Sequence, residues 1–352
     1  MSLHPYRGLP ADQFWTSGVA AVAAPGVDPT RPAPFTIAAN EPVAAAGSCF
    51  AQHIARHLRA SGFSFLEVEP PENEAAPAFS ARFGNIYTVR QLRQLLLGAY
   101  GLHRPAERAW QRPDGRFIDP LRPQIFPDGF ATELDVRTAR RAHMRAVRQM
   151  FQECRAFVFT LGLTECWLAA DGTALPVPPG VLGVEPAGGA ADFHNFTVAE
   201  MRADMDQFLA DLRVVNPGVK VILTVSPVPL VATYEAKHVL VANTYSKAAL
   251  RVVAEETAAA HDNVAYFPSY EIITAPQLRG AYFAEDLRSV TEEGVAHVMR
   301  VFSASMMRDA VTAAAPVPRA RTETVVTAAD RARYEALGEI LCDEDLLEDR
   351  PR

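Results

Sequence analysis

The turn 47–50 joins a short apolar strand to an amphipathic helix and carries the serine best placed to do chemistry in this sequence. We expect the strand at 43–46 and the helix at 52–59, so Ser48 lies at the helix N-terminus. Unpaired backbone N–H groups and the helix dipole favour an anion there, including a developing oxyanion. Ser48 is therefore a candidate nucleophile, and the alternative is that it only caps the helix. Cys49 is a rival nucleophile, but its side chain should point into the helix packing.

Other polar residues also follow predicted strands. Thr164 and Glu165 come after one strand, Ser226 after a second, and Asp286 after a third. In a parallel α/β sheet, ligands bind beyond the carboxyl ends of the strands. We therefore expect these residues to lie at one edge of the sheet with Ser48.

Gly84 and Asn85 are candidates for stabilising an oxyanion. A glycine lets the backbone approach the oxyanion closely, and Asn85 adds a side-chain donor. The alternative is that the pair forms only a tight turn before a helix that Thr88 caps.

These segments together resemble a known family. Residues 47–51 read Gly-Ser-Cys-Phe-Ala, the motif that names the GSCFA family, which is related to the SGNH (GDSL-like) hydrolases. Segments 83–88, 160–165 and 224–229 are similar to further segments of that family and come in its order, and 286–290 stands where such enzymes carry their last block. The resemblance covers roughly 42–302. It implies a three-layer α/β sandwich with a central, mostly parallel sheet, and an acyl-enzyme formed on Ser48.

The sequence departs from the SGNH pattern at the block of oxyanion donors, where related hydrolases carry Gly-x-Asn-Asp. Thr164 replaces the Asn and Glu165 replaces the Asp. A threonine hydroxyl still donates a hydrogen bond, although with a shorter reach than an amide. Glu165 either orients a neighbouring group or pairs with an arginine as part of the structure.

The catalytic base is the second departure. SGNH-type enzymes usually carry Asp-x-x-His before the last helix, and here Asp286 is followed by Ser289 in the histidine position. His238, on the loop after the Ser-Pro-Val-Pro segment, is our candidate base, with Asp286 orienting its imidazolium as the third group of a triad does. His194, before a helix N-terminus, is the second candidate base.

The remaining elements alternate between strands and helices. Strands are expected at 62–69, 156–161, 219–225 and 264–267, a hairpin at 167–178, and helices at 88–100, 133–151, 198–214, 245–260 and 291–307. This alternation predicts a parallel sheet covered on both faces.

We expect three parts in the chain: an irregular arm at 1–40 packed on the core, an α/β domain at 41–308, and a linker with a short helical acidic tail at 309–352. Within the domain, the Pro-rich insertion 102–130 forms a lid or a substrate wall. In it, Trp110 stacks on a sugar or fills a gap, and Arg122 offers a planar fork of donors for a carboxylate or phosphate. The arginines of helix 133–151 are expected to form a solvated face.

Composition limits the classes of function. The 352 residues carry a net charge of -7, which argues against a nucleic-acid surface. The four cysteines lack CxxC or metal-like spacing, so we expect neither a disulfide framework nor a zinc site. No signal segment or bilayer-length apolar run is apparent, which favours the cytoplasm. Nothing in the sequence requires a metal or an organic cofactor.

Three functions remain open. The first is a serine esterase or deacylase acting on O-acyl groups, of a small molecule or a glycan. The second is an O-acyltransferase of polysaccharide biosynthesis that uses the same acyl-enzyme. The third is a non-catalytic binding protein with a hydrolase fold, which the changes at Ser289 and Thr164 suggest.

Overall fold

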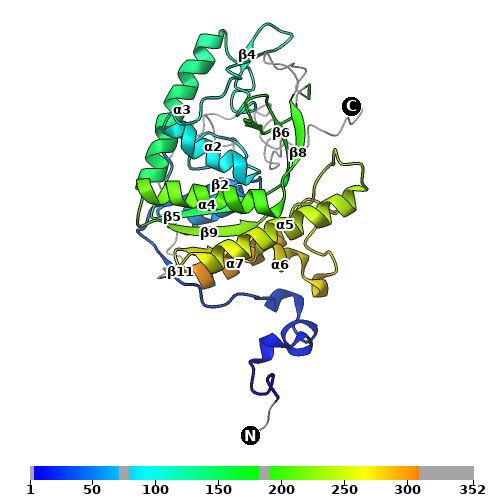
Figure 1. Cartoon of the computed structure of the whole chain (residues 1–352). Coiled ribbons are helices and arrows are strands. Elements are labelled where there is room, and N and C mark those ends of the chain that lie inside the picture. The colour runs from blue at the N-terminus through cyan, green and yellow to red at the C-terminus, as the bar shows by residue number, and fades with distance from the viewer. Residues whose placement is uncertain (1–3, 71–78, 179, 182–190, 309–352) are drawn as a thin grey trace, which may run out of the picture.

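The centre of the molecule is a parallel sheet of four strands (Figure 1). The structure is a computed structural model that describes residues 4–70, 79–178, 180–181 and 191–308. The strand order is β10-β9-β5-β2, with β2 at Val43–Gly47, β5 at Ala156–Leu161, β9 at Lys220–Val225 and β10 at Val264–Tyr266. Every residue of β2 and β5 is buried, as expected for strands covered on both faces.

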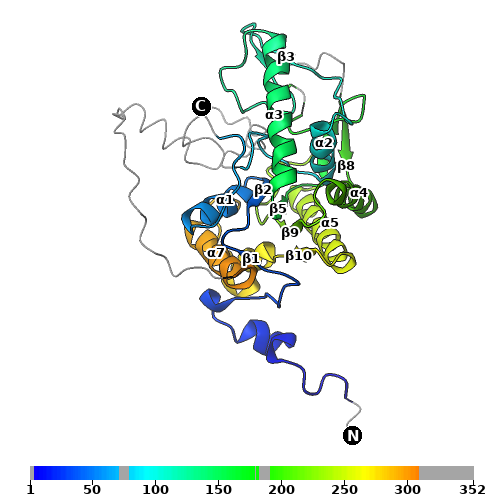
Figure 2. The same cartoon turned by 90° about the vertical axis from the view of Figure 1, so that its left-hand side faces the viewer.

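Helices cover both faces of this sheet (Figure 2). One face packs against α2 (Val89–Ala99), α3 (Glu133–Glu153), α4 (Val198–Val215) and α5 (Val239–Ala260). The other face packs against α1 (Ala51–Ala60), α6 (Ser269–Thr274) and α7 (Glu292–Met306). Because side chains alternate along a strand, Phe157 and Phe159 of β5 join the first core, whereas Val158 joins the second.

Threonine caps fix the starts of three helices on the first face. Thr88, Thr132 and Thr197 each form a capping box, in which the hydroxyl accepts from the backbone N–H three residues on. The predicted cap at Thr88 is confirmed, and the predicted helices 88–100, 133–151 and 198–214 agree with α2, α3 and α4 to within two residues.

Smaller sheets lie around the central one. β6 (Glu165–Leu168), β7 (Ala174–Leu175) and β8 (Asp192–Asn195) form an antiparallel sheet, which contains the predicted hairpin. The insertion contains a hairpin of β3 (Trp110–Gln111) and β4 (Phe117–Ile118), and β1 (Ile37–Ala38) pairs with β11 (Met307–Arg308).

Two predicted elements differ from the structure. The expected strand 62–69 is reduced to one bridge between Val43 and Phe65, because backbone N–H groups of this segment bond to three separate parts of the chain. The helix expected from 245 begins six residues earlier, at Val239, where His238 caps it. The short helix α6 was not predicted.

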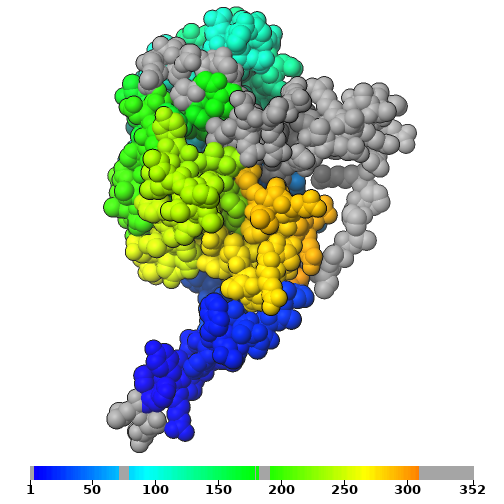
Figure 3. Space-filling model, turned by 90° about the vertical axis from the view of Figure 1, so that its right-hand side faces the viewer, coloured from blue at the N-terminus to red at the C-terminus, as the bar shows by residue number. Residues whose placement is uncertain are grey.

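The N-terminal arm projects from the body of the molecule (Figures 1 and 3). Residues 4–26 form short turns that are exposed or half-buried, and the first buried residue is Val27. The expectation that the whole arm packs on the core is therefore wrong for its first part, where the large apolar side chains of Tyr6, Leu9, Phe14 and Trp15 are exposed. The expected tail at 309–352 lies outside the described residues.

Candidate active site

The close pairing of the parallel strands β2 and β5 shapes the turn before Ser48. Gly47 has a φ of +140°, and a Cβ at this position would lie 2.5 Å from the carbonyl oxygen of Thr160. The Ser48 N–H donates to that oxygen at 3.1 Å. Only glycine fits without strain where the two strands approach so closely, and Gly47 fixes the turn at the carboxyl end of β2.

The Ser48 hydroxyl is buried without a hydrogen-bond partner. The residue is 2% exposed, and Oγ meets no donor or acceptor among the described residues. The N-cap of α1 is Phe50, and no side chain caps this helix. The capping interpretation of Ser48 is therefore wrong, and the hydroxyl remains available at the sheet edge.

Other polar atoms at this edge are also unsatisfied. The hydroxyl oxygens of Thr160 and Thr164 are fully buried and have no hydrogen-bond partner in the described part of the chain. Buried polar side chains in proteins are usually paired, so such a group points to a bound water, a ligand or a reaction. The ends of β2 and β5 thus carry polar atoms that the protein itself does not satisfy.

The segment with Gly84 and Asn85 lies against the Ser48 turn. The Ile86 N–H donates to the Gly47 carbonyl at 2.8 Å, which holds the neighbouring Asn85, 4% exposed, at this edge. Gly84 has a φ of +72° with open space where a Cβ would stand. The oxyanion role of Gly84 and Asn85 stays a prediction.

Lys247 is a buried basic residue that the sequence analysis missed. It lies on α5, is 2% exposed, and donates from Nζ to the Gly162 carbonyl at 3.0 Å. Gly162 packs on the serine, since a Cβ there would lie 2.9 Å from Ser48 Cβ. Helical spacing was the available signal, because Lys247 stands three residues before the core residue Leu250 and seven before Ala254.

The predicted triad of Ser48, His238 and Asp286 is not assembled. His238 is exposed and its Nδ1 accepts from the Leu240 N–H, which caps α5. Ser246 contacts Thr164 from the same helix, and its position eight residues further on puts His238 about 12 Å along the axis from that contact. We therefore correct the expectation that His238 reaches Ser48 in this arrangement.

Asp286 closes a local turn. Its exposed carboxylate accepts from the backbone N–H groups of Arg288 and Ser289 and from the Ser289 hydroxyl at 2.6 Å. Burial opposes the shift, but these hydrogen bonds hold the pKa of Asp286 below its ordinary value. Ser289, which replaces the expected histidine, thus bonds to the aspartate itself.

The sheet edge nevertheless gathers several of the predicted loops. The Ser226 N–H donates to the Leu161 carbonyl at 2.8 Å, and Arg288 Nε donates to the Pro229 carbonyl at 3.1 Å. The loops after β9 and before α7 therefore lie next to each other, with the first of them beside the end of β5.

Glu165 and His194 bond to other partners. Glu165 accepts from the Thr233 hydroxyl at 2.5 Å and from the Tyr234 N–H, and burial raises the pKa of Glu165 above its ordinary value. It holds the loop after β9 rather than pairing with an arginine. His194 Nε2 lies 2.8 Å from Glu200 at the start of α4, so no contact with Ser48 is seen within the described residues.

A cavity of about 270 Å³ opens beside this edge. Tyr87 lines it and also packs on Gly162, which links the cavity to the Ser48 turn. Trp167, Phe193 and Tyr234 form a mutually packed aromatic wall, with ring centroids 4.9–5.8 Å apart. Glu165 lines the same cavity, so the wall combines aromatic rings with one carboxyl group.

The cysteines do not compete with Ser48. Cys49 is disulfide-bonded, so its sulfur is not a rival nucleophile. Cys154 and Cys166 are free but buried, and burial raises the pKa of each thiol to about 12. Both remain protonated at neutral pH.

The described part of the chain also bears on metal binding and on membrane spanning. No group of three or more His, Cys, Asp or Glu residues there is arranged to hold a metal ion. None of its helices has the length and apolar character needed to cross a bilayer.

These features define an α/β protein with a buried, unpaired serine at the carboxyl edge of its parallel sheet. The sequence profile of the GSCFA family matches residues 42–302, most of the chain, so the protein belongs to the GSCFA family. A comparison with curated proteins finds no match.

Proposed function

We propose that this protein is a serine hydrolase of the SGNH type that cleaves O-acyl esters through an acyl-enzyme on Ser48. The observation that carries the proposal is the Ser48 hydroxyl, 2% exposed and without a partner among the described residues, at the carboxyl edge of the sheet. A serine that only stabilised the fold would be expected to bond to a neighbour.

The reaction needs a base for the serine proton. In the proposal this base is Lys247, whose Nζ lies 3.0 Å from the carbonyl oxygen of Gly162, the residue that packs on Ser48. To act as the base, Lys247 first releases a proton to solvent and then takes the Oγ proton while Oγ bonds to the ester carbonyl carbon. The proton then passes to the departing alkoxide, and water hydrolyses the acyl-enzyme to regenerate Ser48.

The oxyanion of the tetrahedral intermediate requires donors at the same edge. The Asn85 amide and the Thr164 hydroxyl are the proposed side-chain donors, since both are buried next to the Ser48 turn. The aromatic cavity of Trp167, Phe193 and Tyr234 supports a ring-containing alcohol such as an O-acylated glycan.

The test is hydrolysis of a short-chain p-nitrophenyl ester by the full chain. Ser48→Ala should lose at least about 100-fold in kcat/KM. The matched control is Ser305→Ala on α7, where Oγ only donates to the Val301 carbonyl, and it should retain wild-type activity. Equal hydrolysis by wild type and Ser48→Ala would exclude the proposal.

A second candidate is a non-catalytic binding protein. It is favoured by one observation, that Asp286 bonds to Ser289 and His238 caps α5 instead of forming a triad. In that case the unpaired atoms at the sheet edge bind a ligand without reacting, and the wild-type chain shows no Ser48-dependent hydrolysis.

A further inference from the structure

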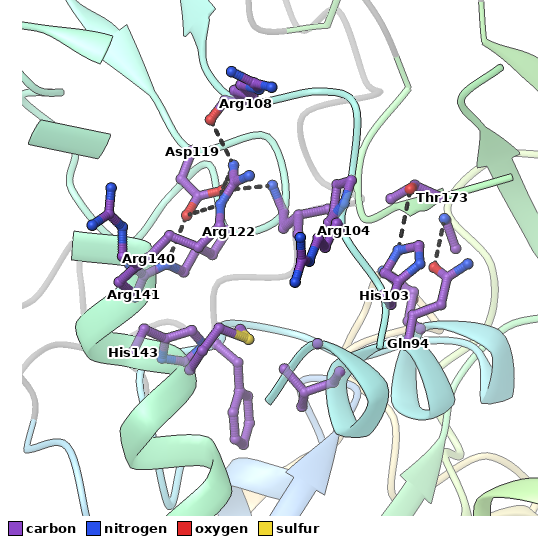
Figure 4. Close-up of a pocket in the computed structure, with 18 of the residues that line it drawn as sticks. Gln94, His103, Arg104, Arg108, Asp119, Arg122, Arg140, Arg141, His143 and Thr173 are labelled. Carbon is purple, nitrogen blue, oxygen red and sulfur yellow. Dashed lines mark hydrogen bonds and ion pairs between the residues drawn. The ribbon is translucent and has the colours of Figure 1, made fainter. Parts of the chain in front are cut away.

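A second, larger cavity of about 700 Å³ lies between the Pro-rich insertion, α2 and α3 (Figure 4). Its size is that of a site for a small molecule or cofactor. Six arginines line it: Arg104, Arg108, Arg122, Arg137, Arg140 and Arg141. Three of them come from α3, whose arginines were expected to form a solvated face: Arg141 is exposed, whereas Arg137 and Arg140 are half-buried.

The acidic groups present neutralise only part of this charge. Asp119 is the one carboxylate among the described lining residues, and it bonds to Arg122 Nε at 3.0 Å and to Arg140 Nη2 at 2.5 Å. Glu69 bonds to His143 Nδ1 at 2.5 Å and lies 3.7 Å from Arg122 Nη1. Among the described residues, six guanidinium groups against two carboxylates leave an excess of positive charge.

One of the arginines, Arg122, is buried in the cavity wall and has one N–H group without an acceptor among the described residues. Arg122 is 3% exposed; its Nε bonds to Asp119 and its Nη1 donates to the Arg82 carbonyl at 3.2 Å. Its Nη2 is buried and has no hydrogen-bond partner among the described residues. A buried charged group with an unmet donor is costly unless a ligand supplies the acceptor.

The other cavity arginines are also available to a ligand. Within the described residues, Arg104, Arg108, Arg137 and Arg141 form no ion pair, and Arg104 bonds only to the Gly101 carbonyl. They approach from two directions, two from the insertion side and two from α3. Basic residues from both parts of the chain therefore line the cavity.

We propose that this cavity binds a ligand through a diphosphate or longer phosphate group. Guanidinium groups bind phosphate oxygens in pairs, and several of them around one cavity match a group with more than one negative charge. The cavity is larger than a diphosphate needs, which leaves room for the part of the ligand attached to it. This inference does not depend on the proposed hydrolase activity, because no part of it involves Ser48.

The test is calorimetric titration of the full chain with inorganic pyrophosphate at low ionic strength. The key variant is Arg141→Gln, and its matched control is Arg145→Gln, one turn further along α3, exposed, and outside the cavity. We expect Arg141→Gln to raise the Kd for pyrophosphate about tenfold, in line with the loss of one charge-assisted hydrogen bond. Arg145→Gln should leave the Kd within about twofold.

Further titrations identify the source of the phosphate group. A nucleoside diphosphate that binds more tightly than pyrophosphate would assign a nucleotide, and equal affinities would assign the diphosphate alone; both support the inference. Citrate that binds more tightly than pyrophosphate would contradict it. The inference is also wrong if pyrophosphate shows no saturable binding or if Arg145→Gln weakens it as much as Arg141→Gln. Ser48→Ala should bind normally, so this claim and the proposed function fail separately.

Discussion

At the residue scale, Ser48 differs from Ser80, another buried serine near β2, in what its hydroxyl does. Ser80 is fully buried and accepts from the Ala45 N–H at 2.9 Å, whereas Ser48 Oγ has no partner in the described chain. A buried hydroxyl without a hydrogen bond costs free energy, and one with a bond contributes.

This contrast predicts opposite effects on stability. Ser48→Ala should raise the free energy of unfolding by about 1 kcal/mol, and Ser80→Ala should lower it by about 1 kcal/mol. Urea unfolding of both variants measures this. If Ser48→Ala destabilises the protein as Ser80→Ala does, the Ser48 hydroxyl has a structural partner and its functional role loses support.

The second prediction at this scale concerns the two basic residues. Lys247→Met should lose at least about 100-fold in kcat/KM for a p-nitrophenyl ester, because it removes the proposed base. His238→Ala should retain activity, since its imidazole caps α5 about two turns from the Ser246 contact. The opposite pattern would return the catalytic role to His238. Thermal unfolding of each variant serves as the folding control.

At the element scale, the close pairing of β2 with β5 determines where the serine lies. A Cβ on Gly47 would lie 2.5 Å from a backbone oxygen that belongs to a buried strand and cannot move. Gly84 shares the positive φ but has open space around it. Substitutions at the two glycines therefore distinguish two effects: steric overlap combined with backbone strain at Gly47, and backbone strain alone at Gly84.

We predict that Gly84→Ala costs about 1 kcal/mol of stability, from its φ alone, and that Gly47→Ala costs about 3 kcal/mol or more. Gly47→Ala should also reduce ester hydrolysis, because β2 must shift from β5. Chemical denaturation and the esterase assay check both. Equal losses of stability in the two variants would mean that β2 and β5 are packed less closely at Gly47 than the structure shows.

The sequence predicts most elements because their signals are local. The unbroken apolar runs of β5 and β9 and the caps Thr88 and Thr197 are visible in the chain itself. The start of α5 was missed because a histidine, not a usual capping residue, caps it. Lys247 was missed because lysines are rarely buried, so its residue type indicated an exposed position although its helical spacing placed it on the buried face. Whether distant loops bring a base to Ser48 depends on three-dimensional paths that no local pattern encodes.

At the scale of the whole molecule, buried imidazoles make stability depend on pH. Burial lowers the pKa of five histidines below the ordinary 6.5: His53, to about 4, and His57, His103, His143 and His297. His297 is an example: Tyr282 Oη lies 2.7 Å from its Nδ1 and the Val27 carbonyl accepts from its Nε2 at 2.8 Å, and burial lowers the pKa although the bond to Val27 raises it. This arrangement uses a neutral ring and ties the end of the arm to α7.

A histidine with a lowered pKa in the folded state stabilises the fold fully above pH 6.5 and loses that contribution as the pH falls. Each unit of lowering corresponds to about 1.4 kcal/mol. We predict that the free energy of unfolding falls on the order of a few kcal/mol between pH 7 and pH 4, measured by urea titration across this range. A stability that stays constant or rises over this interval would contradict the neutral, buried histidines.

The most direct test of the central claim is the intact mass of the full chain after exposure to a fluorophosphonate. This reagent bonds covalently to a serine whose hydroxyl is activated by a base. We predict one adduct on the wild-type chain and none on Ser48→Ala. An unmodified wild-type chain, or an adduct that persists in Ser48→Ala, would contradict the assignment of Ser48 as the nucleophile.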